Sequence, residues 1–146
     1  MNLLDQVKAF HIRYGHLIGR HAAVPSDETM RMRLALIAEE FFELMSAAEA
    51  TPIQIGARHV LEDGFASWLC YHHDVDLPDF VDALGDLLYV IMGTFVVLGV
   101  DPEPILAEIH RANMTKIPNG LNKPTKPEDW TPPDIEGELR RQGWST

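Results

Sequence analysis

Apolar residues recur with helical spacing in the first half of the chain. From 2 to 18 they follow the i, i+3, i+4, i+7 pattern of an amphipathic helix. A second helix is expected from 27 to about 50, because Ser26 can cap its first turn and Pro52 disfavours helical geometry in the residue before it. Residues 53 to 73 fit either one broken helix or two short ones. The apolar face of the second helix comprises Leu34, Ile37, Phe41, Leu44, Met45 and Ala48.

The second half of the chain predicts two more long helices and a short one. One runs from 79 to about 100, and the next covers 103 to 116. Between them, Gly99-Val100-Asp101-Pro102 combines a helix stop with a helix start. The composition of 117 to 132 indicates a loop, and a short helix is expected at 133 to 142. The apolar face of the 79–100 helix comprises Leu84, Leu87, Leu88, Ile91, Phe95 and Leu98.

These elements indicate an all-α fold of four to five helices, in one domain from 1 to 146. A chain of 146 residues has the usual size of a single domain, and no strand-like alternation of useful length occurs. After Asp86 the 79–100 helix is apolar on nearly all sides, so it must be buried on several faces by its own chain or by another subunit. The prediction is a helical bundle completed by oligomerisation, as a homodimer or homotetramer.

The charge balance narrows the classes of partner. With 12 basic and 22 acidic residues the formal charge is -10, which repels nucleic-acid backbones and anionic membranes. A single cysteine, Cys70, excludes an internal disulfide and a thiolate zinc cluster within one chain. No uninterrupted apolar run reaches the ~18 residues of a membrane span. We therefore expect a soluble, cytoplasmic protein that binds neither a nucleic-acid polymer nor a membrane.

Three glutamates form an EExxE motif in the second helix. Glu39, Glu40 and Glu43 fall within a sector of about 100°, opposite the apolar face, when residues are placed at 100° intervals. Taken alone, such a motif is usually a solvated outer face. The next acidic helix changes that interpretation.

Asp79, Asp82 and Asp86 project within roughly 60° of one another on the 79–100 helix. The same sector continues toward the C-terminus with Val90, Gly93 and Val97, so Asp86 lies at the edge of a buried surface, where an uncompensated carboxylate is costly. No lysine or arginine occurs between Arg58 and Arg111, so a metal can supply the missing positive charge, and oxygen-only ligands favour Mg²⁺ or Mn²⁺. The alternative is a core acid that is protonated or bonded to the backbone.

Three of the four lysines lie within eleven residues, at Lys116, Lys123 and Lys126. Asn113 precedes Lys116 by three positions and shares its helix face, so this region is rich in hydrogen-bond donors. Such a set can hold a di- or triphosphate whose other oxygens bind metal ions. For Lys116 alone, a cation that complements the dipole at a helix C-terminus is an equal alternative.

In their order along the chain, these motifs resemble a known family. The EExxE helix, DALGDLLYVIMGT, GVDP followed by HRANMTK, and the WTPPD tail are similar to the MazG-like and phosphoribosyl-ATP pyrophosphohydrolase-like all-α NTP pyrophosphatases. The resemblance covers about 30 to 50 and 79 to 135. Each motif is loose, and it is their order and spacing that make the set specific.

The resemblance implies hydrolysis between the α- and β-phosphates of a nucleotide by a dimer or tetramer. It implies that Glu39, Glu43 and Asp86 are metal ligands, and that Glu40 is a ligand or the base that orients the attacking water. The second family motif is commonly ExxD, and here the position three before Asp86 is Ala83. Asp82 is the candidate replacement, which leaves the number of bound metals open.

The expected function is a Mg²⁺-dependent nucleoside triphosphate pyrophosphohydrolase, in which Mn²⁺ can replace Mg²⁺, that serves the nucleotide pool. Two alternatives stay open: a non-catalytic nucleotide-binding or oligomerisation module, and a phosphoribosyl-ATP pyrophosphohydrolase. A ferritin-like di-iron bundle would need Glu-x-x-His pairs, and the sequence contains none. The sequence does not specify the base or the sugar of the substrate.

Overall fold

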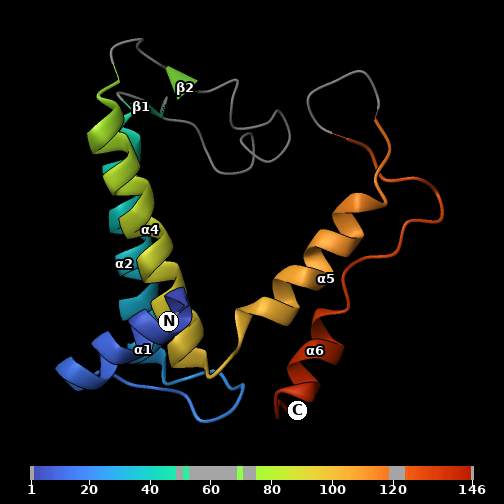
Figure 1. Ribbon diagram of the computed structural model, residues 1–146, viewed down its shortest axis with the longest axis horizontal. Helices are drawn as coiled ribbons and strands as arrows, with labels where there is room; N and C mark the ends of the chain where they lie inside the picture. The colour runs from blue at the N-terminus through green and yellow to red at the C-terminus, as the bar shows by residue number, and fades with distance from the viewer. Residues whose placement is uncertain (1, 49–50, 53–68, 71–74, 119–123, 146) are drawn as a thin grey trace. The chain divides into compact units, whose positions relative to one another are not determined.

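The computed structural model describes residues 2–48, 51–52, 69–70, 75–118 and 124–145 (Figure 1). These residues contain five α-helices, so the all-α prediction is confirmed. Two strands of two residues each also occur, and they pair in antiparallel fashion, Thr51 with Cys70 and Pro52 with Leu69. The elements are α1 (Leu3–Tyr14), α2 (Asp27–Ala47), β1 (Thr51–Pro52), β2 (Leu69–Cys70), α4 (Leu77–Leu98), α5 (Pro102–Met114) and α6 (Ile135–Arg141).

The chain forms two compact units. One consists of 1–25 and 92–146, and the other of 26–91, so α4 contributes to both. The single domain expected for 1–146 stays a prediction. The helix or helices expected at 53–73 fall outside the described residues, apart from the two residues of β2.

The first helix is shorter than its apolar pattern predicts. Asn2 caps α1, because its side chain accepts a hydrogen bond from the amide of Asp5 at 2.9 Å. The helix ends at Gly15, which adopts a left-handed conformation with φ of 69°. The expectation that this helix extends to residue 18 was wrong, because it followed apolar spacing past a glycine that closes the helix.

Helices α2 and α4 run antiparallel in the 26–91 unit, side by side in Figure 1. Ser26 caps α2 as predicted, with its hydroxyl accepting from the amide of Thr29 at 3.3 Å. Near this end Arg33 is buried, and its Nη2 donates to the carbonyl of Val90 in the second half of α4 at 2.6 Å. The opposite end of α2 lies beside the beginning of α4, where both helices line one cavity.

The side of α2 that packs on α4 differs from the predicted apolar face. Leu34 is 58% exposed, and Phe41 is also exposed, although both belong to that face. Arg33, Ile37 and Glu40 are instead buried or half-buried. Apolar spacing identifies the hydrophobic side of a helix, but not the side that its partner helix covers, so it did not predict that Leu34 and Phe41 are exposed.

The connection from α4 to α5 confirms the turn expected there. Gly99 has φ of 67°, a conformation that favours glycine, and a Cβ added at this position would lie 2.3 Å from the carbonyl oxygen of His21. Asp101 caps α5 by accepting from the amide of Glu103 at 3.0 Å, and Pro102 occupies the first helical position.

The core of the 1–25 and 92–146 unit lies between α5, α6 and the end of α4. Its buried members are Ala22, Val100 and Ile105. The amide side chain of Gln142 joins the elements by accepting from the backbone N–H of Asp101 at 2.6 Å and donating to its carbonyl at 3.1 Å. Partly buried residues packed against this core are Phe95, Leu98, Ile135, Leu139 and Trp144.

Helix α4 is also long and apolar enough to cross a membrane, by length and composition, and it alone passes that test among the described residues. The core helix of a soluble protein passes the same test, but such a helix is mostly buried, whereas 22% of the apolar stretch of α4 is buried. The expectation that the chain does not bind a membrane stays a prediction. The buried residues of α4 are Met92, Gly93, Val96 and Val97.

Candidate active site

A cavity of about 410 Å³ lies between the C-terminal turns of α2 and the N-terminal turns of α4. Both walls belong to the 26–91 unit. Glu43 contributes from α2, and three aspartates contribute from α4. The lining residues are Glu43, Ser46, Ala47, Asp79, Asp82, Ala83 and Asp86.

Helical spacing explains how these acids reach a common cavity. In α4, Asp79, Asp82 and Asp86 are three and four residues apart, so one side of the helix carries all three. In α2, Glu43 and Ala47 are likewise four residues apart. Small side chains at Ala47 and at Ala83 leave the volume between the two helices open.

Glu40 stands apart from the other acids because part of its carboxylate is buried. Its Oε2 is shielded from solvent and has no hydrogen-bond partner among the described residues. Burial, followed by the charges of Glu43, Asp86 and Glu39, raises the pKa of Glu40 above its ordinary value. An unpartnered buried carboxylate oxygen is unfavourable, so this position is suited to a bound cation or to a proton.

The donor set fits a hard divalent cation. Four carboxylates and the hydroxyl of Ser46 line the cavity, and all of them offer oxygen ligands. Among the described residues that line the cavity, no lysine or arginine neutralises them. Within the described residues, no three acidic, histidine or cysteine side chains already converge on one point. The acids thus surround a space in which an ion could be bound, without forming a closed cluster.

The predicted metal ligands differ in how the structure places them. Glu43, Asp82 and Asp86 line the cavity together, which brings both motifs to one place. Glu39 is exposed and Glu40 is half-buried, and neither is among the lining residues. Asp79 lines the cavity but was not included among the predicted ligands. Its signal in the sequence is the spacing of three residues to Asp82, which is the spacing of the family's ExxD motif.

The predicted phosphate-binding residues lie in the other unit, on α5 and after it. Asn113 is exposed in the last turn of α5, and Lys116 is half-buried just beyond it. Lys126 places its ammonium 4.1 Å from the ring centre of Trp130, in a cation–π contact. Lys123 lies outside the described residues. The role of these four residues stays a prediction.

The segment after α5 is attached to that helix by specific bonds. Ile117 and Thr125 exchange two backbone hydrogen bonds of 3.0 Å. The indole N–H of Trp130 donates to the carbonyl of Ala112 at 2.9 Å. Because Lys126 stacks on the same indole, its position depends on where Trp130 is anchored.

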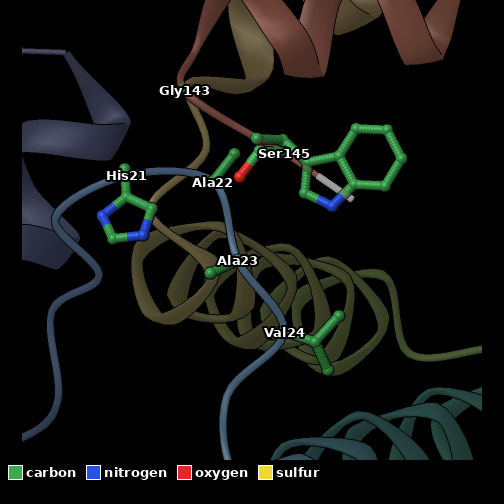
Figure 2. Close-up of a pocket in the computed structure, with 7 residues that line it drawn as sticks. His21, Ala22, Ala23, Val24, Gly143 and Ser145 are labelled. Atoms are coloured by element: carbon green, nitrogen blue, oxygen red, sulfur yellow. The ribbon is translucent and has the colours of Figure 1, made fainter.

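A second cavity, of about 270 Å³, lies in the 1–25 and 92–146 unit. Figure 2 shows His21, Ala22, Ala23 and Val24 on one segment, with Gly143 and Ser145 on the other. No carboxylate side chain occurs among its lining residues, which also include Trp144. It therefore lacks the ligands that the acidic cavity offers to a divalent ion.

Comparison with known families decides the identity of the chain. The model of the phosphoribosyl-ATP pyrophosphohydrolase family matches residues 7–113, which is well over half of the sequence. The chain belongs to the phosphoribosyl-ATP pyrophosphohydrolase family. The match spans both carboxylate motifs and ends at Asn113, before Lys116. No curated protein matches the chain significantly.

Membership of the phosphoribosyl-ATP pyrophosphohydrolase family confirms the resemblance to the MazG-like all-α NTP pyrophosphatases, of which this family is a part. The chain is accordingly a hydrolase of the pyrophosphohydrolase type. Pyrophosphohydrolases of this type generally use a divalent metal, in agreement with the oxygen ligands of the acidic cavity.

Proposed function

We propose that this chain hydrolyses nucleoside triphosphates, ribo or deoxy, to the monophosphate and pyrophosphate with the aid of Mg²⁺. The observation that carries the proposal is the cavity between α2 and α4, where acids of both motifs meet. Glu40 lies close enough to Glu43 and Asp86 to feel their charges, and its buried Oε2 has no hydrogen-bond partner among the described residues. Family membership supports the type of reaction. The oxygen-only set of ligands supports Mg²⁺, with Mn²⁺ as a replacement.

The metal would be held by acids from both helices. Glu43, Asp82 and Asp86 line the cavity, and Glu40 adds a carboxylate whose Oε2 has no hydrogen-bond partner in the part of the chain that the structure describes. Glu39 completes the proposed set from the solvent side of α2. When bound, the ion would supply positive charge that offsets the charge of the phosphate oxygens in the transition state.

Glu40 is the proposed base. In the reaction a water oxygen forms a bond to the α-phosphorus, and the bond from that phosphorus to the bridging oxygen breaks, releasing pyrophosphate. Glu40 would accept the proton that the water loses. Burial, followed by the charges of Glu43, Asp86 and Glu39, raises the pKa of Glu40, which makes its carboxylate a stronger base than an isolated glutamate.

Asn113, Lys116, Lys123 and Lys126 are proposed to bind the leaving pyrophosphate. Their support is chemical: an amide and three ammonium groups within a short stretch of an otherwise acidic chain. Single alanine variants should raise KM for the nucleotide.

The experiment that tests the proposal measures pyrophosphate release across a panel of NTPs, dNTPs and phosphoribosyl-ATP with Mg²⁺. We expect release from one or more nucleoside triphosphates. Release from phosphoribosyl-ATP alone would replace our substrate with the one in the family's name. No release from any of them would favour a non-catalytic nucleotide-binding module. A broad profile across bases would support a housekeeping role in the cytoplasmic nucleotide pool.

We also propose that the chain forms a homodimer or homotetramer. An apolar stripe follows the side of α4 opposite its acids, and all of its members are exposed. A second copy of the chain could cover this stripe and so complete a bundle. The stripe comprises Leu77, Val81, Leu84 and Leu88.

Light scattering on the purified chain tests the proposed assembly. We expect the wild type to be larger than a monomer and Leu84→Glu to shift it toward a monomer, because a charge within an apolar interface is unfavourable. Leu106→Glu is the matched control, since Leu106 is an exposed leucine on α5 outside the stripe. A monomeric wild type would contradict the proposal.

A further inference from the structure

Arg33 is a buried cation where the first half of α2 lies beside the second half of α4. It is 4% exposed, and its Nη2 donates to the carbonyl oxygen of Val90 at 2.6 Å. Fifty-seven residues separate the two positions in the chain, so this bond joins elements that are otherwise distant in sequence. Burial of a guanidinium is unfavourable and lowers the pKa of Arg33. An apolar side chain would fill the same buried position without this cost.

The two ends of this hydrogen bond are aligned with the acidic cavity. Glu40 follows Arg33 by seven residues, which is about two turns, so both project from nearly the same side of α2. Val90 follows Asp86 by four residues, or about one turn of α4. The bond therefore joins the side of α2 that carries Glu40 to a position on α4 about one turn beyond Asp86.

Apolar contacts alone would leave the alignment of the helices weakly defined. Hydrophobic packing is non-directional, whereas a charged hydrogen bond to one carbonyl is satisfied in a single alignment. A slip of α2 by one residue shifts its side chains by about 1.5 Å and turns them by about 100°. Such a slip would move Glu40 and Glu43 away from the aspartates of α4.

We infer that Arg33 is a positioning residue, whose hydrogen bond to Val90 sets the register of α2 against α4 and so holds the acids of the two helices around one cavity. The first part of this inference concerns the protein alone. The second part, that this register serves metal binding, rests on the proposed function.

A distance measurement tests the register without metal or substrate. Nitroxide labels are placed at Ala47→Cys and Ala83→Cys, two small residues that line the cavity from opposite helices, with Cys70→Ser in the background. We expect one narrow distance distribution when Arg33 is present and a broadened or shifted one in Arg33→Met. A distribution that does not change in Arg33→Met would overturn the inference.

Mn²⁺ titration tests the consequence for metal binding. Arg33→Met should weaken Mn²⁺ binding about tenfold, the usual effect of losing a group that orients metal ligands. Arg33→Lys keeps a buried cation and a donor, so it should fold readily and recover part of the affinity. Equal affinity in the wild type and Arg33→Met would overturn the role in metal binding.

Ile37→Ala is the control for a merely structural effect. Ile37 is half-buried on the same side of α2, and its truncation should lower the melting temperature while leaving Mn²⁺ affinity within about twofold. If Ile37→Ala weakened Mn²⁺ binding as much as Arg33→Met, the special role of Arg33 would be excluded. If the wild type bound no Mn²⁺, the proposed function would fail, while the distance measurement would still decide the register.

Discussion

At the scale of single residues, the proposed chemistry depends on one carboxylate oxygen. Glu40 Oε2 is buried without a partner among the described residues, while its neighbours Glu43 and Asp86 line an open cavity. Removing the charge of such a group need not harm the fold, because an amide of similar shape relieves the repulsion between the acids. Function and stability can therefore be separated at this position.

Glu40→Gln should abolish turnover while nucleotide binding survives. A glutamine has nearly the same shape but cannot accept the proton of the attacking water, so kcat should fall by about 10²- to 10⁴-fold. Pyrophosphate release measures turnover, and calorimetry with the nucleotide measures binding. Full activity in this variant would remove Glu40 from the mechanism.

Glu108 predicts a pH dependence of stability. Its carboxylate accepts from Arg111 Nε at 3.0 Å and from the amide of Asp134 at 3.1 Å, and these bonds lower its pKa. Because the pKa of this carboxylate is lower in the folded than in the unfolded state, its ionised form stabilises the fold at pH values above the unfolded-state pKa. This contribution is lost as the pH falls through the folded-state pKa. Glu108→Gln should therefore lower the melting temperature at neutral pH, and the difference from wild type should vanish in acid.

Thermal unfolding from neutral pH into the acid range measures this effect. Glu103→Gln is the control, because Glu103 is an exposed acid of the same helix whose side chain accepts no hydrogen bond from the described residues. A difference between Glu108→Gln and wild type that persists at acidic pH would show that the lost bonds do not depend on the charge.

The residues of the site were predictable to the extent that helical spacing determines them. Glu43, Asp82 and Asp86 meet at one cavity as their spacing suggested. Glu39 does not line it, because a sector of about 100° on one helix is wider than the strip that a partner helix covers. The convergence of acids from two helices depends on their register, and a periodic pattern contains no information about register.

At the scale of elements, local signals located the ends of helices better than apolar periodicity did. Ser26 and Asp101 cap helices as their residue types predict, and Gly99 closes α4. Gly15 closes α1 earlier than the apolar pattern indicates. The packed side of α2 was not predictable, since Arg33 is buried while Leu34 is exposed, and only the position of α4 decides between them.

The segment after α5 is predicted to depend on Trp130 for its attachment. Trp130→Phe keeps an aromatic ring but removes the N–H that donates to the carbonyl of Ala112, so the variant should lose about 1 kcal/mol of stability. For a chain of this size that corresponds to a melting temperature lower by about 3 °C. Thermal unfolding followed by circular dichroism measures it.

Lys126→Met is the control for this variant. It removes the ammonium from the face of Trp130 while leaving the bond from the indole N–H to Ala112 in place. Its effect on stability should be smaller, because a cation–π contact at an exposed position contributes about 0.5–1 kcal/mol. An unchanged melting temperature in Trp130→Phe would show that the bond does not hold the segment.

At the scale of the whole molecule, family membership and local geometry independently support a pyrophosphohydrolase. The family match extends over 7–113 and thus over parts of both compact units. The acidic cavity belongs to the 26–91 unit, and the donor-rich residues Asn113, Lys116 and Lys126 belong to the other. The exposed stripe on α4 adds a surface that a second copy could cover.

The central claim is that acids from α2 and α4 share a divalent ion, and Mn²⁺ titration of a mutant cycle tests it most directly. The cycle compares the wild type with Glu43→Ala, Asp86→Ala and the double variant. We predict that each single change weakens Mn²⁺ binding at least about tenfold. The double change should weaken it by less than the product of the two single fold-changes, because both acids bind the same ion. Single variants that bind Mn²⁺ as tightly as the wild type would contradict the account.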